Sequence, residues 1–153
     1  MKIAIGNDHA GVELKNTIVS FLQDLGHEIV NVGTDDDKPY PYAVSGFRVA
    51  KLVASQKVER GVLICGTGVG ISLAANKVKG IRACVCSEPC TAKLSKQHND
   101  TNIIAFGSRI VGAELAKAIV TEWLSASYEG GRHNSRIAML SEIEDTQELH
   151  YSN

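Results

Sequence analysis

The stretch 61-GVLICGTGVGISLAANK-77 decides the fold. Its first five residues, 61–65, are apolar and bounded by glycine, which predicts a buried strand. Residues 66–70 (GTGVG) predict a glycine loop, and residues 71–77 predict a short helix. A strand, a tight glycine loop and a helix in direct succession are typical of α/β proteins.

The same succession of strand and helix patterns extends outward on both sides of this stretch. Strands are predicted at 2–6, 27–32, 61–65, 81–86 and 102–106, and helices at 14–25, 43–55, 71–77, 88–97 and 112–125. In the second helix, Val44, Phe47 and Leu52 are expected to point inward. Five β-rich runs alternating with helices predict right-handed crossovers and a mostly parallel sheet covered on both faces.

The C-terminal part is expected to stand apart from this sheet. After Tyr128-Glu-Gly-Gly, residues 134–147 form a last amphipathic stretch with Ile137, Met139 and Leu140 among its apolar residues. We interpret residues 1–153 as a single domain whose tail, from about residue 130, packs on a neighbouring subunit. This interpretation predicts a homodimer.

Composition excludes several classes of function. The chain has 153 residues and a net charge of -1, which offers no overall field for nucleic acid or an anionic membrane surface. No leader peptide or membrane span is visible in the sequence, so we expect a cytoplasmic protein without nucleic-acid or membrane partners. The spacing of Cys84, Cys86 and Cys90 matches no common zinc motif, and a disulfide scaffold is not expected in a chain with this apolar content.

Polar residues gather in three clusters near strand ends. They are Asn7-Asp8-His9, Cys65 with the loop 66–70, and Gln97-His98-Asn99-Asp100. Each cluster alone has an ordinary structural explanation, such as a helix cap or a small buried thiol. Together they are expected to meet at one edge of the sheet, where α/β proteins bind ligands.

The glycine loop predicts an anion site. Gly66, Gly68 and Gly70 leave backbone N–H groups uncovered, and a helix begins directly after them. The loop lacks the sixth-position glycine of the dinucleotide fingerprint G-x-G-x-x-G. No Walker-type phosphate loop occurs in the chain either. A small anion is therefore favoured over a nucleotide.

Cys65 precedes this loop, whose N–H groups would favour a thiolate. A base beside an oxyanion cradle suits proton abstraction next to a carbonyl group. Covalent catalysis by Cys65 is the competing chemistry. It is less favoured because four basic residues indicate an anionic substrate: Arg109, Arg132, His133 and Arg136.

Several segments of the chain form a recognisable series: GNDHAG (6–11), ICGTGVGISLAANK (64–77), QHNDTN (97–102), AFGSR (105–109) and YEGGRH (128–133). Together they resemble the ribose-5-phosphate isomerase B family, which is grouped with galactose-6-phosphate isomerases. The resemblance runs nearly from end to end. It implies a Rossmann-like three-layer sandwich, a homodimer that can pair into a tetramer, and no metal or organic cofactor.

The resemblance also implies a role for individual residues. Cys65 looks like the base that moves a proton between C1 and C2 of the sugar, with Thr67 beside it, and His98 looks like the residue that opens the sugar ring. The remaining residues are similar to a substrate-binding set, in which Arg132 and Arg136 come from the other subunit: Asp8, His9, Tyr42, Gly66, Gly68, Val69, Gly70, Asn99, Arg109, Arg132 and Arg136.

One segment departs from the family pattern. The chain has Lys-Pro-Tyr-Pro-Tyr at 38–42, so either Tyr40 or Tyr42 corresponds to the family tyrosine. The leading function is interconversion of D-ribose 5-phosphate and D-ribulose 5-phosphate. The alternatives are an isomerase of allose or galactose 6-phosphate, and a non-catalytic sensor of sugar phosphates or nucleotides.

Overall fold

The computed structural model describes residues 1–150, and residues 151–153, the end of the expected C-terminal tail, lie outside the described residues. The strands are β1 (Lys2–Asn7), β2 (Glu28–Asn31), β3 (Arg60–Cys65), β4 (Ala83–Val85) and β5 (Ile103–Gly107). The helices are α1 (Val12–Asp24), α2 (Tyr42–Ala54), α3 (Val69–Ala75), α4 (Pro89–Asn99), α5 (Ala113–Ser125) and α6 (Asn134–Thr146). Two 3-10 turns precede α1 and α6, at His9–Gly11 (η1) and Gly131–His133 (η2).

All five strands are parallel, in the order β2-β1-β3-β5-β4. The pairing places Cys65 opposite Gly107 and Gly61 opposite Ile103. Because successive residues of a strand point to opposite faces, β3 and β5 supply both cores of the protein. The expected α/β fold with a parallel sheet is confirmed.

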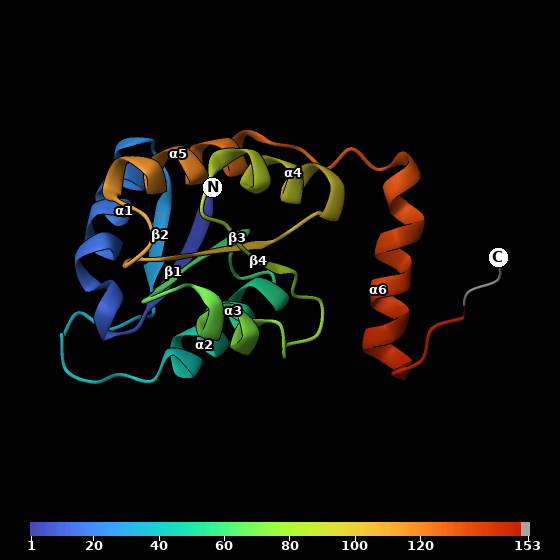
Figure 1. Cartoon of the computed structure of the whole chain (residues 1–153), viewed down its shortest axis with the longest axis horizontal. Helices are drawn as coiled ribbons and strands as arrows, with labels where there is room; N and C mark the ends of the chain where they lie inside the picture. Colours follow the sequence, from blue (N-terminus) through green and yellow to red (C-terminus); the bar gives the residue numbers. More distant parts are fainter. Residues whose placement is uncertain (151–153) are drawn as a thin grey trace.

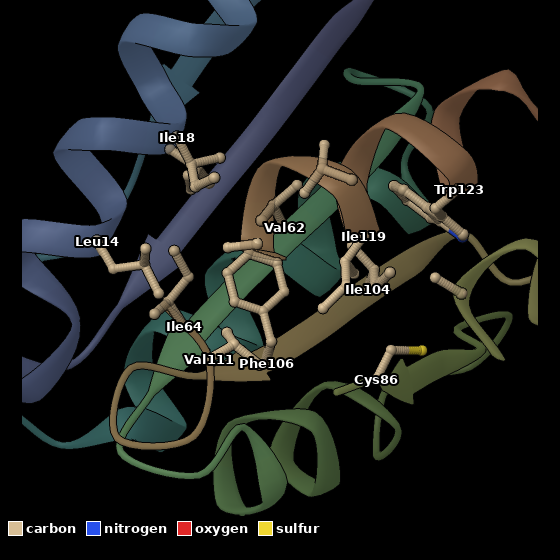
Figure 2. Close-up of a cluster of buried hydrophobic side chains, with 14 of the residues drawn as sticks. Leu14, Ile18, Val62, Ile64, Cys86, Ile104, Phe106, Val111, Ile119 and Trp123 are labelled. Atoms are coloured by element: carbon tan, nitrogen blue, oxygen red, sulfur yellow. The ribbon is translucent and has the colours of Figure 1, made fainter. Parts of the chain in front are cut away.

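Helices cover both faces of the sheet (Figure 1). On one face, residues of α1, α4 and α5 pack on Val62, Ile64, Ile104 and Phe106, and Figure 2 shows Ile119 and Trp123 completing this cluster. On the other face, Val49 of α2 and Ile71 of α3 pack on Leu63, Cys65 and Ala105. Cys65 therefore faces the side of the sheet that α2 and α3 cover.

Two local expectations were wrong. Phe47 is 54% exposed, because α2 presents its smaller residues Ser45, Gly46 and Val49 to the sheet. A Cβ on Gly6 of β1 would lie 2.9 Å from Val49, so this helix lies too close to the sheet for an aromatic ring. β4 is also shorter than predicted: just before it, the Arg82 N–H donates to the Asn102 side chain at 2.9 Å.

Helix α6 stands away from the sheet, as expected (Figure 1). None of its residues is buried, and Leu140 and Ile143 are 48% and 40% exposed. Two contacts tie its far end to the turn before β4: Glu144 accepts the Gly80 N–H at 3.0 Å, and Lys79 pairs with Asp145 at 2.6 Å. Packing of α6 on a partner subunit stays a prediction. Among residues 1–150, no helix has both the length and the apolar character of a membrane span.

Candidate active site

Cys65 is the last residue of β3, and its thiol lies at the start of the glycine loop. The side chain is 4% exposed, and its sulfur accepts the Gly68 N–H at 3.1 Å. This donor, positioned by the backbone, stabilises negative charge on the sulfur. The structure thus places a thiol and loop N–H groups together, as the sequence predicted.

Two glycines allow the loop to take this path. Gly68 has a φ of 81°, a conformation that disfavours any residue with a side chain. Gly107, at the end of β5, passes so close to the loop that a Cβ there would lie 2.6 Å from the Cα of Thr67. The loop therefore lies directly on the end of the neighbouring strand, and its position depends on that contact.

The end of β1 brings Asp8 and His9 to the same edge. Asp8 is buried, donates its N–H to the Ile64 carbonyl at 3.1 Å, and accepts the Ala10 N–H at 3.0 Å. His9 accepts the Tyr40 N–H on Nδ1 at 3.2 Å. These contacts set the backbone of Asp8 beside that of Cys65, because β1 and β3 are neighbours in the sheet.

Arg109 and Tyr42 flank the glycine loop from two sides. The Arg109 N–H donates to the Gly66 carbonyl at 3.1 Å, and a Cβ on Gly66 would lie 3.3 Å from Nη1 of Arg109. The ring of Tyr42, at the start of α2, lies against Gly70, where a Cβ would be 2.8 Å from Cζ. Tyr40 contacts His9 instead, so both tyrosines border this edge and only Tyr42 touches the glycine loop.

His98 and Asn99 lie at the opposite edge of the sheet, at the amino ends of the strands. The expectation that all three polar clusters meet at one edge was therefore wrong. They end α4, which runs back from the carboxyl ends of the strands to the amino end of β5. Cys65 pairs with Gly107 at one end of β5, whereas Ile103, which follows the 97–100 cluster, pairs with Gly61 at the other. From Ile103 to Gly107 the strand rises by about 3.3 Å per residue over four residues, which puts the two edges about 13 Å apart. Within one chain, His98 cannot share a small substrate with Cys65.

A second cluster forms around His98. Its ring stacks on that of His133, with centroids 4.4 Å apart and planes 13° from parallel. Oε2 of Glu129 lies 3.9 Å from Nε2 of His98 and 3.8 Å from Nε2 of His133. The Glu129 N–H donates to the Gln97 carbonyl at 3.0 Å, which fixes this loop on α4.

The charge around His133 is mostly positive. Burial lowers the pKa of His133, and the neighbouring His98, Arg132 and Arg136 lower this pKa further. Arg132 and Arg136 are both exposed and lie on the turn η2 and helix α6. The sequence pattern indicates no role for Glu129 beyond its place in the YEGGRH segment.

The model of the family described as Ribose/Galactose Isomerase matches residues 3–140. The chain belongs to this family. Among its relatives, ribose-5-phosphate isomerase B of Escherichia coli is 56% identical over 94% of this chain and 96% of its own length. D-erythrulose-4-phosphate isomerase of Pectobacterium atrosepticum is 38% identical over 98% of this chain and 99% of its own length.

Solved structures of the family have the same fold. The structure of Clostridium thermocellum ribose-5-phosphate isomerase B superimposes with a TM-score of 0.95, at 48% identity, and the match covers 97% of this chain and all of that one. Family membership and the α/β fold expected from the resemblance are therefore confirmed. The roles of the individual site residues stay predictions.

Proposed function

We propose that this chain interconverts D-ribose 5-phosphate and D-ribulose 5-phosphate. The observation that carries the proposal is the Cys65 sulfur held at 3.1 Å from the Gly68 N–H, at the start of the glycine loop. The Escherichia coli and Clostridium thermocellum relatives bear the name of this activity at 56% and 48% identity. An aldose–ketose isomerase of sugar phosphates is thus supported by both the site and the family.

In the proposed chemistry, the Cys65 thiolate removes the proton from C2 of the open-chain aldose. The electron pair of the C–H bond forms the C1–C2 double bond of an enediolate, whose negative charge is on O1. The proton of the C2 hydroxyl then moves to O1, the C2 carbonyl forms, and the electron pair of the double bond takes the proton back from the thiol at C1. Gly68 and Val69 already donate their N–H groups to Cys65 and Thr67, so other backbone N–H groups of the loop donate to the enediolate oxygen. Preorganised donors stabilise this oxygen more strongly than they do the carbonyl. Thr67 lies in the same loop and binds a sugar hydroxyl.

We further propose that the working site combines two copies of the chain. A catalytic acid or base has to lie within hydrogen-bond distance of the atom it serves, and ring opening involves the carbon next to the one that Cys65 deprotonates. The separation of about 13 Å between the two edges supports His98 and Asn99 acting on the partner's Cys65 edge. Arg132 and Arg136, which lie near His133, would then complete a phosphate site with the partner's His9 and the partner's Arg109. Four free cysteines fit a reducing compartment, so the proposal places the reaction in the cytoplasm.

The first experiment measures ketose formation from ribose 5-phosphate with EDTA present, for the wild type, Cys65→Ala and a matched control, Cys90→Ala. Cys90 is exposed and lies in α4, outside both clusters. We expect the Cys65 variant to lose orders of magnitude in kcat and the Cys90 variant to match the wild type. Equal turnover by Cys65→Ala would refute the role of Cys65. Faster turnover of allose or galactose 6-phosphate would change the substrate, and no turnover of any sugar phosphate would favour a sensor.

The shared site has its own test, complementation between two inactive variants. Cys65→Ala and His98→Asn are unfolded together and refolded, so that about half of the dimers carry one of each chain. If the site combines two copies, each mixed dimer has one intact site, and activity recovers to about a quarter of the wild-type value. If Cys65 and His98 act within one chain, no mixed dimer has an intact site and the mixture stays inactive.

A further inference from the structure

The cluster around His98 contains three side chains of the kinds that bind metal ions. One ligand atom each of His98, Glu129 and His133 lies within 4.8 Å of the other two, and in the described part of the chain no other group of three such side chains meets this condition. We propose that these residues bind a late first-row divalent cation such as Zn²⁺. The cation is a ligand of the free site and takes no part in the isomerisation.

The donor set suits such a cation. Two imidazoles and one carboxylate are the protein ligands of many zinc sites that keep an open coordination position. Nε2 of each histidine lies 3.8–3.9 Å from the same Glu129 oxygen. Tetrahedral bonds of about 2.1 Å put ligand atoms about 3.4 Å apart, so each histidine has to approach the Glu129 oxygen by a few tenths of an ångström. The stacked rings have to turn about their Cβ–Cγ bonds, because an imidazole binds a metal in the plane of its ring.

The backbone already holds the three residues together. The Glu129 N–H donates to the Gln97 carbonyl at 3.0 Å, directly before His98. The His133 N–H donates to the Gly130 carbonyl at 3.0 Å, which closes the turn between Glu129 and His133. The turn requires a φ of 63° at residue 130, and glycine adopts this angle without strain. Binding therefore needs side-chain rotation only, and the loop entropy is already lost in folding.

The charges around the site set its affinity. Arg132 opposes binding, because its Nε lies 3.4 Å from Nε2 of His133 and its charge repels a cation. Arg132 is exposed and can turn away, and Glu129 supplies the opposing negative charge. His98 and Glu129 are 33% and 48% exposed, which leaves the cation a path from solvent.

The site overlaps with the substrate site, a consequence that rests on the proposed function. If His98 opens the sugar ring and Arg132 binds phosphate, a cation on His98 and His133 excludes the sugar phosphate. We expect Zn²⁺ to inhibit the isomerase competitively, raising KM and leaving kcat unchanged. EDTA would then reverse the inhibition.

The decisive experiment measures Zn²⁺ binding by titration calorimetry near neutral pH without substrate. The variants are Glu129→Gln, which keeps the shape of an exposed side chain, and His133→Asn. The matched controls are His150→Asn, an exposed histidine beside Glu142, and Cys84→Ser, which removes a thiol from the Cys84–Cys86 pair. We expect each site variant to weaken binding at least about tenfold, and the controls to bind as the wild type does.

Other outcomes would overturn the site. Absence of Zn²⁺ binding refutes it, and so does binding that survives Glu129→Gln and His133→Asn but disappears in a control. Co²⁺ gives a second readout: ligand-field bands without thiolate charge transfer support the site, and a thiolate band moves the metal to the cysteines. Binding is measured without turnover, so inactivity toward ribose 5-phosphate would refute the proposed function and leave the metal site standing. Binding without competitive inhibition would refute the overlap.

Discussion

The contact between Gly107 and the glycine loop makes a sharp test of how the loop is positioned. In Gly107→Ala, the new methyl group would lie 2.6 Å from the Cα of Thr67 and 2.7 Å from the Gly66 carbonyl oxygen. Both are backbone atoms, so no side chain can rotate out of the way. Gly107 itself is at the end of β5 and has no proposed contact with substrate.

The size of the effect follows from these distances. Ordinary contact begins at 3.4 Å, so the loop has to move by roughly 0.8 Å away from β5. Overpacking of this kind costs about 1–3 kcal/mol, which lowers the Tm of a domain of this size by several degrees. A displacement of about 1 Å in a catalytic group can lower the rate about 100-fold. We therefore expect kcat to fall by about two orders of magnitude in a protein that remains folded.

The assay compares kcat on ribose 5-phosphate with Tm for Gly107→Ala and for the control Gly112→Ala. A Cβ on Gly112 has no atom within 4 Å, and its φ of -78° accepts alanine. The control should keep its kcat. It should lose little stability, although Gly112 is the N-cap residue of α5. Wild-type kcat in Gly107→Ala would show that the loop does not depend on β5 for its catalytic position, and would refute the reasoning.

Two further predictions concern groups outside the site. Cys86 donates its thiol hydrogen to Cys84 across 3.6 Å, which lowers the pKa of Cys84 to about 7. Alkylation of Cys84 by iodoacetamide, followed by peptide mass spectrometry, should therefore rise with a midpoint near pH 7, and Cys86→Ala should move that midpoint toward about 8.5; an unchanged midpoint would exclude Cys86 as the cause. Lys15 is 1% exposed and pairs with Asp35, whose pKa this hydrogen bond lowers. The Asp35 carboxylate is 74% exposed, so solvent screens the pair, and Asp35→Asn should cost about 1 kcal/mol or less in urea unfolding at pH 7, where the carboxylate is charged in both states. This difference should shrink as the pH falls through the lowered pKa of Asp35, and a constant difference down to pH 2 would contradict an ionic origin.

The fold could be predicted because its signals are local. Each strand is a short apolar run, each helix has apolar residues at helical spacing, and their alternation dictates parallel pairing. The errors occurred where packing overrode local pattern. Phe47 has the spacing of an inward residue, but α2 lies so close to β1 that only small side chains fit between them. Periodicity carries no information on the distance between a helix and a sheet.

The Cys65 half of the site could also be predicted, because Cys65 and its loop are contiguous in the chain. Asp8 and His9 follow β1 as Cys65 follows β3, so parallel pairing brings them to one edge. Arg109 follows β5, the other neighbour of β3, and its N–H donates to the Gly66 carbonyl of the loop. The role of Glu129 could not be predicted, because the stacking of His133 on His98 depends on where the turn after α5 ends.

The position of His98 was misjudged although the sequence contains the information needed. Asp8 and Cys65 follow their strands, whereas His98 precedes β5, and in a parallel sheet residues before a strand lie at its amino end. A single chain therefore cannot unite His98 with Cys65, however its loops are arranged. The same chain leaves α6 without any buried residue, directly after the cluster around His98. The homodimer proposed above accounts for both features: its partner would cover Leu140 and Ile143 and present the partner's Cys65 to His98.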